Sequence, residues 1–147
     1  MTLQLKLKKL HPDAIMPTLG SKSAACYDLY ALEDTTFNLD EIKLVRTGWA
    51  AELPPGYRLN LYVRSSTPLK RGYMLANSVG IIDNDYRGEI MIQLIRISKS
   101  EFTDTIKAGE KIAQIEIVKY ESITDIVIVD ELSSTERGDG GFGSTGN

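Results

Sequence analysis

Residues 57–63 read YRLNLYV, and this stretch decides which fold to expect. Every second residue can pack in a hydrophobic core, namely Tyr57, Leu59, Leu61 and Val63. The residues between them, Arg58, Asn60 and Tyr62, carry polar groups. A period of two is typical of a β-strand that has one face buried and the other exposed. Residues 3–8 alternate in the same way, with Leu3, Leu5 and Leu7 set against Gln4, Lys6 and Lys8.

Other parts of the chain extend this pattern. Three short runs are rich in β-branched residues and are predicted as strands buried on one or both faces: IMIQLIRI (90–97), IAQIEIV (112–118) and IVIV (126–129). Turn-forming residues separate the strands, for example PPG (54–56), DND (83–85) and AGE (108–110). No segment keeps a helical period for three turns. The best helix candidate is one or two turns near residues 66–70, with Ser66 able to cap the free N–H groups.

These patterns predict an all-β fold, a barrel or sandwich of many short strands. The length of 147 residues suits one compact domain with a polar C-terminal arm, and the formal net charge of −3 argues against a nucleic-acid-binding surface. One cysteine, Cys26, and one histidine, His11, exclude an internal disulfide, a thiolate metal cage and a histidine cluster. The first ten residues alternate rather than form an apolar run, so we expect a soluble intracellular protein without a signal peptide or membrane span.

Three strand-like segments carry unusual polar groups. Asp28 interrupts the apolar run AACYDLYA (24–31), where a carboxylate is either exposed at a sheet edge or paired. Arg64, Ser65 and Ser66 follow the strand 57–63 and offer a guanidinium and two hydroxyls to a phosphate, unless Ser66 is only a helix cap beside a surface arginine. Gln114 lies among apolar neighbours, where an amide needs a partner from the backbone or from a ligand.

Two glycine-containing segments add further candidates. In NSVGIIDNDYRGEI (77–90), a hairpin framed by Gly80 and Gly88 presents Asp83, which can hold a water molecule, although most hairpin loops are simply turns. In RGDGGFGSTGN (137–147), successive glycines can form an anion-binding nest and an aromatic ring can stack on a base. A plain flexible tail is the alternative for this second segment. Together the five segments suit a nucleotide with a phosphate chain.

In this order and spacing, the five segments resemble the five motifs of trimeric dUTP pyrophosphatases (dUTPases), over nearly the whole chain from Leu3 to Gly146. GIIDNDYRGEI and RGDGGFGSTG carry the resemblance most specifically. It implies a jelly-roll-like β-barrel in residues 1–130 and a flexible Gly-rich arm in residues 131–147. It also implies a homotrimer with exchanged arms, in which each arm closes over a neighbour's site, and no direct binding of nucleic acid.

The resemblance also implies a reaction, in which water attacks the α-phosphate of dUTP to give dUMP and pyrophosphate. Asp83 would activate the water, and Mg²⁺ would be held mainly by the triphosphate, with Asp28 reaching it through a water molecule. The implied substrate-binding residues are Arg64, Ser65, Ser66, Asn77, Gly80, Ile81, Ile82, Tyr86, Met91, Gln114, Arg137, Phe142, Gly143, Ser144 and Thr145. Of these, Tyr86 would exclude a 2′-hydroxyl and Phe142 would stack on uracil.

The chain departs from the family pattern at three positions, with Cys26 and Ser66 at usual glycines and Val63 at a usual proline. None of these changes removes a group with a direct chemical role. Two rival functions stay open. A related fold deaminates dCTP with a glutamate base, but this chain has Gln93 there, and an amide cannot carry the proton. The second rival is a non-catalytic binding or regulatory protein on the same scaffold.

Overall fold

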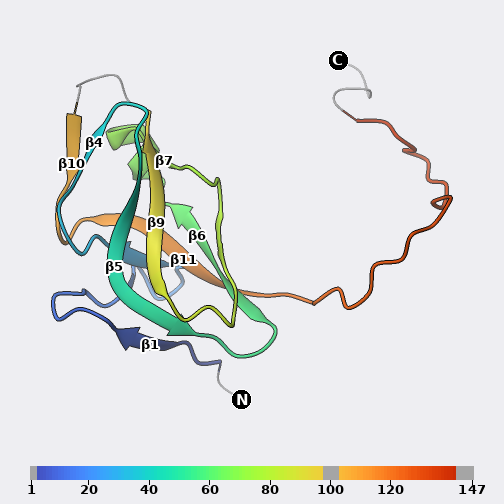
Figure 1. Ribbon diagram of the computed structural model, residues 1–147, viewed down its shortest axis with the longest axis horizontal. Helices are drawn as coiled ribbons and strands as arrows, with labels where there is room; N and C mark the ends of the chain where they lie inside the picture. The colour runs from blue at the N-terminus through green and yellow to red at the C-terminus, as the bar shows by residue number, and fades with distance from the viewer. Residues whose placement is uncertain (1–2, 98–102, 142–147) are drawn as a thin grey trace.

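The computed structural model describes residues 3–97 and 103–141, and these form short strands with one helical turn (Figure 1). The five-stranded sheet has the order β2-β3-β11-β6-β8 and the four-stranded sheet the order β1-β5-β9-β7, while β10 pairs with β4. All described strand pairs are antiparallel. The elements are β1 (Lys6–Lys9), β2 (Thr18–Leu19), β3 (Tyr27–Tyr30), β4 (Thr35–Asn38), β5 (Ile42–Glu52), β6 (Tyr57–Val63), η1 (Thr67–Arg71), β7 (Tyr73–Leu75), β8 (Gly80–Ile82), β9 (Glu89–Arg96), β10 (Thr103–Ile106) and β11 (Lys111–Lys119).

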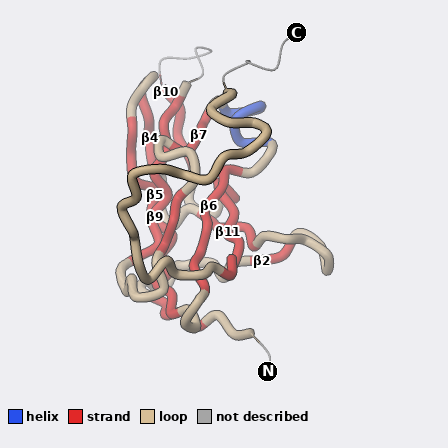
Figure 2. Tube along the Cα trace, turned by 90° about the vertical axis from the view of Figure 1, so that its right-hand side faces the viewer, coloured by secondary structure: helices blue, strands red, loops and turns tan. Residues whose placement is uncertain are grey.

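The inward faces of the two larger sheets form one hydrophobic core. Leu59 and Leu61 of β6 are buried in it, as the alternation in YRLNLYV predicts, and Ile92 and Leu94 of β9 meet them from the other sheet. Figure 2 shows the strands side by side, with η1 in blue near one end. The apolar side chains on these inward faces are removed from water, which stabilises the fold by about 25 cal/mol per Å² of buried apolar surface. The all-β prediction is therefore confirmed.

The helical turn η1 lies where the sequence predicts it, but Ser66 does not cap it with its side chain. Ser66 has helical backbone angles, φ −77° and ψ −21°, rather than the extended angles of most N-cap residues. Pro68 follows at the second helical position and has no N–H to offer a cap. The capping prediction is wrong for these two reasons, and the Ser66 hydroxyl is left available to a ligand.

The chain after β11 runs away from the body of the molecule (Figure 1). Residues 126–129, predicted as a buried strand, form no strand here, and Ile126 and Ile128 are 87% and 95% exposed. Their β-branched composition does favour a strand, but none of the strands described in this structure pairs with them. The prediction is therefore wrong for the single chain. Within the described ranges, the structure contains no helix long and apolar enough to span a membrane.

Candidate active site

One face of the five-stranded sheet gathers the predicted phosphate-binding groups. Gln114 on β11 lies opposite Asp28 on β3 and opposite Tyr62 on β6. Residues directly opposite in antiparallel strands share a face, and so do residues two apart in one strand. Arg64 follows Tyr62 by two positions, so register alone directs it towards the same face as Gln114 and Asp28.

A register shift in β11, between Lys111 and Ala113, brings a further cation to this face. Regular alternation would put Lys111 on the opposite face from Gln114, three residues away. The extra residue, Ile112, is buried beside Ala113 in the core, and Lys111 pairs with Tyr30 instead. A bulge of this kind re-aims the side chains that flank it. Lys111 was absent from the predicted site because no local pattern reveals a bulge.

Asp28 is paired with both neighbouring cations. Its Oδ1 atom lies 2.9 Å from Arg64 Nε and its Oδ2 atom lies 3.0 Å from Lys111 Nζ. Only 8% of Asp28 is exposed to solvent. The simpler of the two predictions, an exposed aspartate at a sheet edge, is therefore wrong. A buried carboxylate is tolerated because cations offset its lost hydration.

The other residues of this group are held to different extents. Gln114 Nε2 donates to the backbone oxygen of Val63 at 3.1 Å, so the amide is bonded to backbone as the simpler interpretation predicts. Ser65 is exposed and Ser66 half-buried at the start of η1. Burial raises the pKa of the Cys26 thiol, and the nearby Glu116 and Asp28 carboxylates add to the rise. The thiol at the usual glycine position therefore stays protonated and adds no charge beside Asp28.

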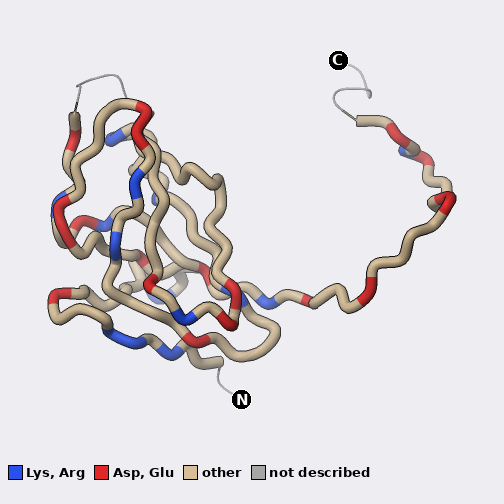
Figure 3. Tube along the Cα trace, viewed as in Figure 1, with Lys and Arg blue, Asp and Glu red and all other residues tan. Residues whose placement is uncertain are grey.

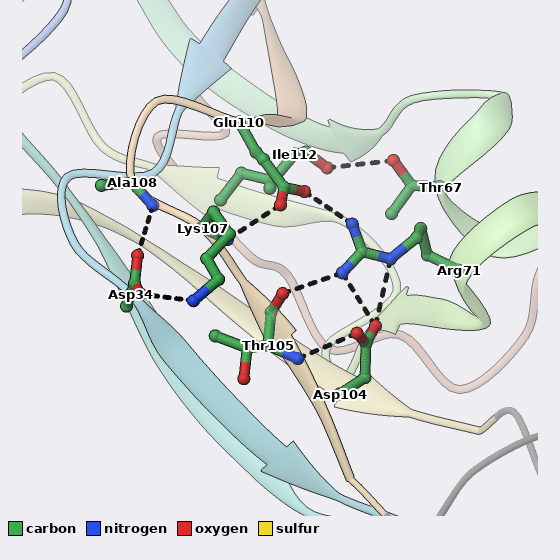
Figure 4. Close-up of polar contacts among 9 residues, drawn as sticks. All are labelled: Asp34, Thr67, Arg71, Asp104, Thr105, Lys107, Ala108, Glu110 and Ile112. Carbon is green, nitrogen blue, oxygen red and sulfur yellow. Dashed lines mark hydrogen bonds and ion pairs between the residues drawn. The ribbon is translucent and has the colours of Figure 1, made fainter.

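Arg71, the last residue of η1, fixes the segment that carries Arg64 to Ser66 (Figure 4). Its guanidinium donates to Asp104 Oδ2 at 2.8 and 3.0 Å, to Glu110 Oε2 at 2.6 Å and to the Thr105 backbone oxygen at 3.0 Å. Three acceptors from the β10–β11 region thus hold one planar group. Because Glu110 directly precedes Lys111, this contact joins the two chain segments that supply the phosphate-binding groups.

The turn between β10 and β11 is itself tightly bonded. Glu110 Oε1 accepts the Lys107 N–H at 2.9 Å, and Asp34 accepts the Ala108 N–H and the Lys107 ammonium at 2.9 and 2.8 Å (Figure 4). These bonds from Lys107 and then Ala108 hold the pKa of Asp34 below its ordinary value. Gly109 has a φ of +81°, which a residue with a side chain adopts only under strain. The predicted AGE turn is therefore present.

The hairpin segment forms a separate pocket of about 260 Å³. Five of the predicted uracil-binding and catalytic residues line it: Ile81, Ile82, Asp83, Tyr86 and Met91. Two further lining residues, Leu44 and Glu89, were not predicted to be part of the site. Leu44 comes from β5, which pairs with β9 over residues 42–46. No sequence signal singles out Leu44, because its role depends on strand pairing. Glu89 lies within the hairpin segment 77–90, but the sequence pattern predicts no role for it in the site.

Glu89 is a fixed wall of this pocket rather than a free carboxylate. Its Oε1 atom accepts the Gly48 N–H at 2.8 Å and its Oε2 atom accepts Arg46 Nε at 3.1 Å. Asp83 differs, since it is exposed at the start of the turn that its backbone oxygen closes with the Tyr86 N–H at 3.2 Å. Of the two carboxylates, Asp83 is the one with room to hold a water molecule against a ligand.

The Tyr86 ring packs over a glycine. A Cβ atom added at Gly88 would lie 2.2 Å from Tyr86 Oη and 2.4 Å from its Cζ, far inside contact distance. The hydroxyl donates to the Glu89 backbone oxygen at 3.2 Å, which fixes the ring. Gly88 is therefore needed for the close approach of the ring, whereas the sequence suggested only a frame for the hairpin.

Asn77 and Gly80 lie at the other end of β8. Asn77 is exposed, and its Nδ2 atom lies 3.6 Å from the position of a Cβ on Gly80. Gly80 is buried against Leu61, and a Cβ there would be 3.0 Å from the Leu61 side chain. The residues that line the hairpin pocket do not include Asn77, so the structure brings Asn77 to Gly80 but not to the Asp83 pocket itself.

The two groups of residues are well separated in one chain. Ile82, next to Asp83, pairs with Leu59, whereas Arg64 lies five residues further along the same strand direction. A rise of about 3.3 Å per residue makes that separation about 16 Å. A single chain therefore does not place Arg64 and Asp83 around one phosphate.

The arm is also apart from both groups. Arg137 is the single cation between residues 120 and 147, and acidic residues flank it (Figure 3). Its Nε donates to the Gly140 backbone oxygen at 2.9 Å within a local turn. Phe142, Gly143, Ser144 and Thr145 lie outside the described residues. Arg137 thus meets neither Arg64 nor Asp83 within this chain.

The metal prediction was tested against the donor set. Across residues 3–97 and 103–141 there is no cluster of three or more acidic, histidine or cysteine side chains able to hold a metal ion. Both oxygens of Asp28 already face cations, so direct coordination of a dication there is unfavourable. The residues fit a metal that arrives on a phosphate chain and reaches Asp28 only through water, as a hydrated Mg²⁺ does.

Comparison with known proteins decides the family. A dUTPase family model matches residues 12–146. The chain belongs to the dUTPase family. A deoxyuridine 5′-triphosphate nucleotidohydrolase of Nautilia profundicola is 44% identical over 98% of this chain and 99% of its own, and one of Picosynechococcus is 43% identical with the same coverage. The dUTPase of Staphylococcus bacteriophage 80alpha, solved with dUpNHpp, has a TM-score of 0.87 and 28% identity over 99% of this chain and 100% of its own.

These relationships confirm two predictions. The chain is an enzyme that hydrolyses dUTP, and its fold is the jelly-roll-like β fold of dUTPases. The dCTP deaminase and the non-catalytic scaffold are therefore less well supported than the dUTPase activity.

Proposed function

We propose that this dUTPase cleaves dUTP between the α- and β-phosphates, giving dUMP and pyrophosphate, with Asp83 positioning and deprotonating the attacking water. The observation that carries the proposal is the hairpin pocket, in which the exposed Asp83 and the fixed Tyr86 ring lie on one rim. Carboxylates are weak bases, so we expect positioning of the water to contribute more to the rate than proton abstraction does.

The same pocket supports selection of deoxyuridine. Backbone groups of Ile81 and Ile82 at the edge strand β8 can read the polar edge of uracil, with Met91 in the same pocket. Gly80 and Asn77, at the other end of β8, would complete the recognition of the base. A close fit leaves no space for the methyl group of thymine and mismatches the donors of cytosine. Tyr86, held over Gly88, would lie against the sugar and exclude a 2′-hydroxyl.

Arg64, Ser65, Ser66 and Gln114 would bind the α- and β-phosphates of the same substrate. The hydrolysed phosphate must touch both this group and Asp83, yet about 16 Å separates the two groups in one chain. The active site would therefore combine the hairpin of one subunit with the phosphate-binding residues of a second. This separation supports a site shared between subunits, and the dUTPase family suggests that the assembly is a homotrimer with three such interfaces.

The exposed arm supports the same assembly. Ile126, Ile128 and Leu132 are 87%, 95% and 89% exposed, which is costly for large apolar side chains unless a partner covers them. A neighbouring subunit would cover them as the arm crosses over to it. Arg137 would then meet the terminal phosphates, Phe142 would stack on uracil, and Gly143, Ser144 and Thr145 would contact the γ-phosphate. Ordering such an arm costs about 1–2 kcal/mol per residue, so a charged ligand is needed to hold it closed.

Mg²⁺ would bind mainly to the triphosphate, with Asp28 contacting its hydration shell. When bound, the ion supplies positive charge that offsets the negative charge developing on the phosphate oxygens. Arg64 and Arg137 would add to that stabilisation as fixed cations. In the cell interior, where we propose the enzyme acts, the reaction would limit uracil in DNA and supply dUMP for thymidylate synthesis.

Pyrophosphate release with Mg²⁺ from dUTP, dTTP, dCTP and UTP, measured side by side, tests this proposal. Release from dUTP alone is expected. Release from all four nucleotides would overturn the pocket and sugar arguments, and release of orthophosphate instead of pyrophosphate would overturn attack at the α-phosphate. Light scattering of the same sample should give about three chain masses, and a monomer that is fully active would overturn the shared site.

A further inference from the structure

We infer that Lys111 is a positioning residue for phosphate binding, which acts on Arg64 through Asp28. The inference rests on the proposed role of Arg64 as a phosphate ligand. It adds a residue that the motif resemblance does not assign, and it gives Asp28 a second role besides contact with hydrated Mg²⁺.

The ion pair between Arg64 and Asp28 leaves the terminal nitrogens of the guanidinium available to a ligand. The Arg64 Nε atom makes a 2.9 Å ion pair with Asp28 Oδ1. Within the described part of the chain, Nη1 and Nη2 of Arg64 have no hydrogen-bond partner, and the side chain is 32% exposed. A guanidinium held at Nε presents its two terminal nitrogens outwards as a fork, which matches two phosphate oxygens.

The carboxylate that pairs with Arg64 is itself paired with Lys111. The Asp28 side chain is 11% exposed, and each of its oxygens faces a different cation. The ammonium of Lys111 holds the second oxygen, Oδ2, and so restricts the orientation of the carboxylate that pairs with Arg64.

Lys111 is held beside Asp28 by a bulge, a fixed turn and an aromatic ring. The bulge at Ile112 puts its side chain on the Asp28 face, and the turn just before it is fixed by the contact of Glu110 with Arg71. The Lys111 ammonium also lies 5.7 Å from the centre of the Tyr30 ring, whose hydroxyl bonds to Thr18 at 2.6 Å. These contacts restrict the long side chain to the neighbourhood of Asp28.

A double-mutant cycle tests the inference. Dissociation constants for dUpNHpp are measured by calorimetry for the wild type, Lys111→Met, Asp28→Asn and the double variant. We expect Lys111→Met to weaken dUpNHpp binding about tenfold in the wild-type background. In the Asp28→Asn background, the same change should cost less than about twofold, because Lys111 then has no carboxylate to orient.

Controls separate this role from a general loss of charge or of folding. Lys111→Arg should restore binding to within about threefold of the wild type, because a cation returns to Asp28. Lys119→Met, at the exposed far end of the same strand, removes the same charge and should leave binding unchanged. Lys111→Met should lower kcat/KM for dUTP, because Arg64 also stabilises charge in the transition state, and should not change binding of 2′-deoxyuridine, which has no phosphates.

Two outcomes would overturn the inference. Equal weakening by Lys111→Met in both backgrounds would mean that the ammonium acts on the phosphates without Asp28. Wild-type affinity in Lys111→Met would mean that it does not act at all. Absence of pyrophosphate release from dUTP by the wild type is a different failure, which would remove the proposed function while the binding cycle still reports on Lys111.

Discussion

Arg64 Nε lies 2.9 Å from Asp28 Oδ1, although β11 separates the strand that ends before Arg64 from the strand that contains Asp28. Neighbouring strands are about 4.8 Å apart, so the arginine side chain crosses the whole width of β11 to reach its partner. The ion pair therefore joins three strands on one face of the sheet.

Asp83→Asn should lower the rate of pyrophosphate release from dUTP by a factor on the order of 10³, because an amide cannot accept the proton of the attacking water. Oligomer mass and the thermal unfolding midpoint should not change, since Asp83 is exposed. Asp85→Asn, two residues further along the same turn, is the matched control and should keep most of the activity. Full activity in Asp83→Asn would remove this residue from the mechanism.

Gly88→Ala should displace the Tyr86 ring, because the new Cβ would lie 2.2 Å from the tyrosine hydroxyl. We expect kcat/KM for dUTP to fall by about 10- to 100-fold, the usual effect of misplacing a substrate contact by an ångström. Selectivity for dUTP over UTP should fall as well, as steady-state kinetics with both nucleotides would show. Gly20→Ala, where nothing lies within 4 Å, is the control. Unchanged selectivity in Gly88→Ala would contradict the sugar-excluding role of Tyr86.

Arg71→Met should lower the free energy of unfolding by about 1–3 kcal/mol, because it leaves Asp104 and Glu110 without their cation. Chemical denaturation measures this change. Lys70→Met, which removes a neighbouring exposed cation, should be almost neutral. An equal loss in the two variants would mean that the bonds of Arg71 add nothing beyond surface charge.

The same pair predicts a dependence on pH. Burial raises the pKa of Asp104, but the hydrogen bond and charge of Arg71 outweigh it and hold the pKa below its ordinary value. A carboxyl with a lowered folded-state pKa stabilises the fold above its unfolded pKa of about 4 and loses that contribution as the pH falls through the folded value. The stability difference between wild type and Arg71→Met should therefore shrink below about pH 4. A difference that grows on acidification would contradict this sign.

Charges placed on the arm should dissociate the assembly. The double change of Ile126 and Ile128 to Glu removes the burial of two large apolar side chains, each contributing about 1.5–3 kcal/mol, and adds two desolvated carboxylates. Light scattering should then report one chain of 16.3 kDa instead of about three. Ser133→Glu, on the same arm, is the polar control and should keep the assembly. A trimer that survives the double change would mean that these residues are not at the interface.

The elements that could be predicted from the sequence are those with a strong local pattern. Alternation in residues 57–63 and the apolar runs of β9 and β11 predicted strands that are present, and the glycine turns at residues 54–56 and 108–110 are where expected. The predicted site residues Ile81, Ile82, Asp83, Tyr86 and Met91 do meet in one pocket. These residues lie close together in the chain or on paired strands, so a short motif was enough to find them.

Residues that act through distant contacts could not be predicted in this way. Lys111 reaches Asp28 only because a bulge shifts the register of β11, and Leu44 joins the hairpin pocket only because β5 pairs with β9. Residues 126–129 carry the composition of a buried strand but have no partner strand within residues 3–97 and 103–141. Each of these outcomes depends on segments far apart in the sequence, which composition and periodicity do not describe.

The amino-acid sequence by itself determined the strand-forming pattern, the turns and the kinds of side chain available for nucleotide chemistry. The tertiary structure decided which of them meet: Arg64 with Asp28 and Lys111, Arg71 with Asp104 and Glu110, and the Tyr86 ring with Gly88. The physical reason is that backbone preference and hydrophobic alternation act over a few residues, whereas strand register, bulges and buried ion pairs are fixed only when the sheets close around their core.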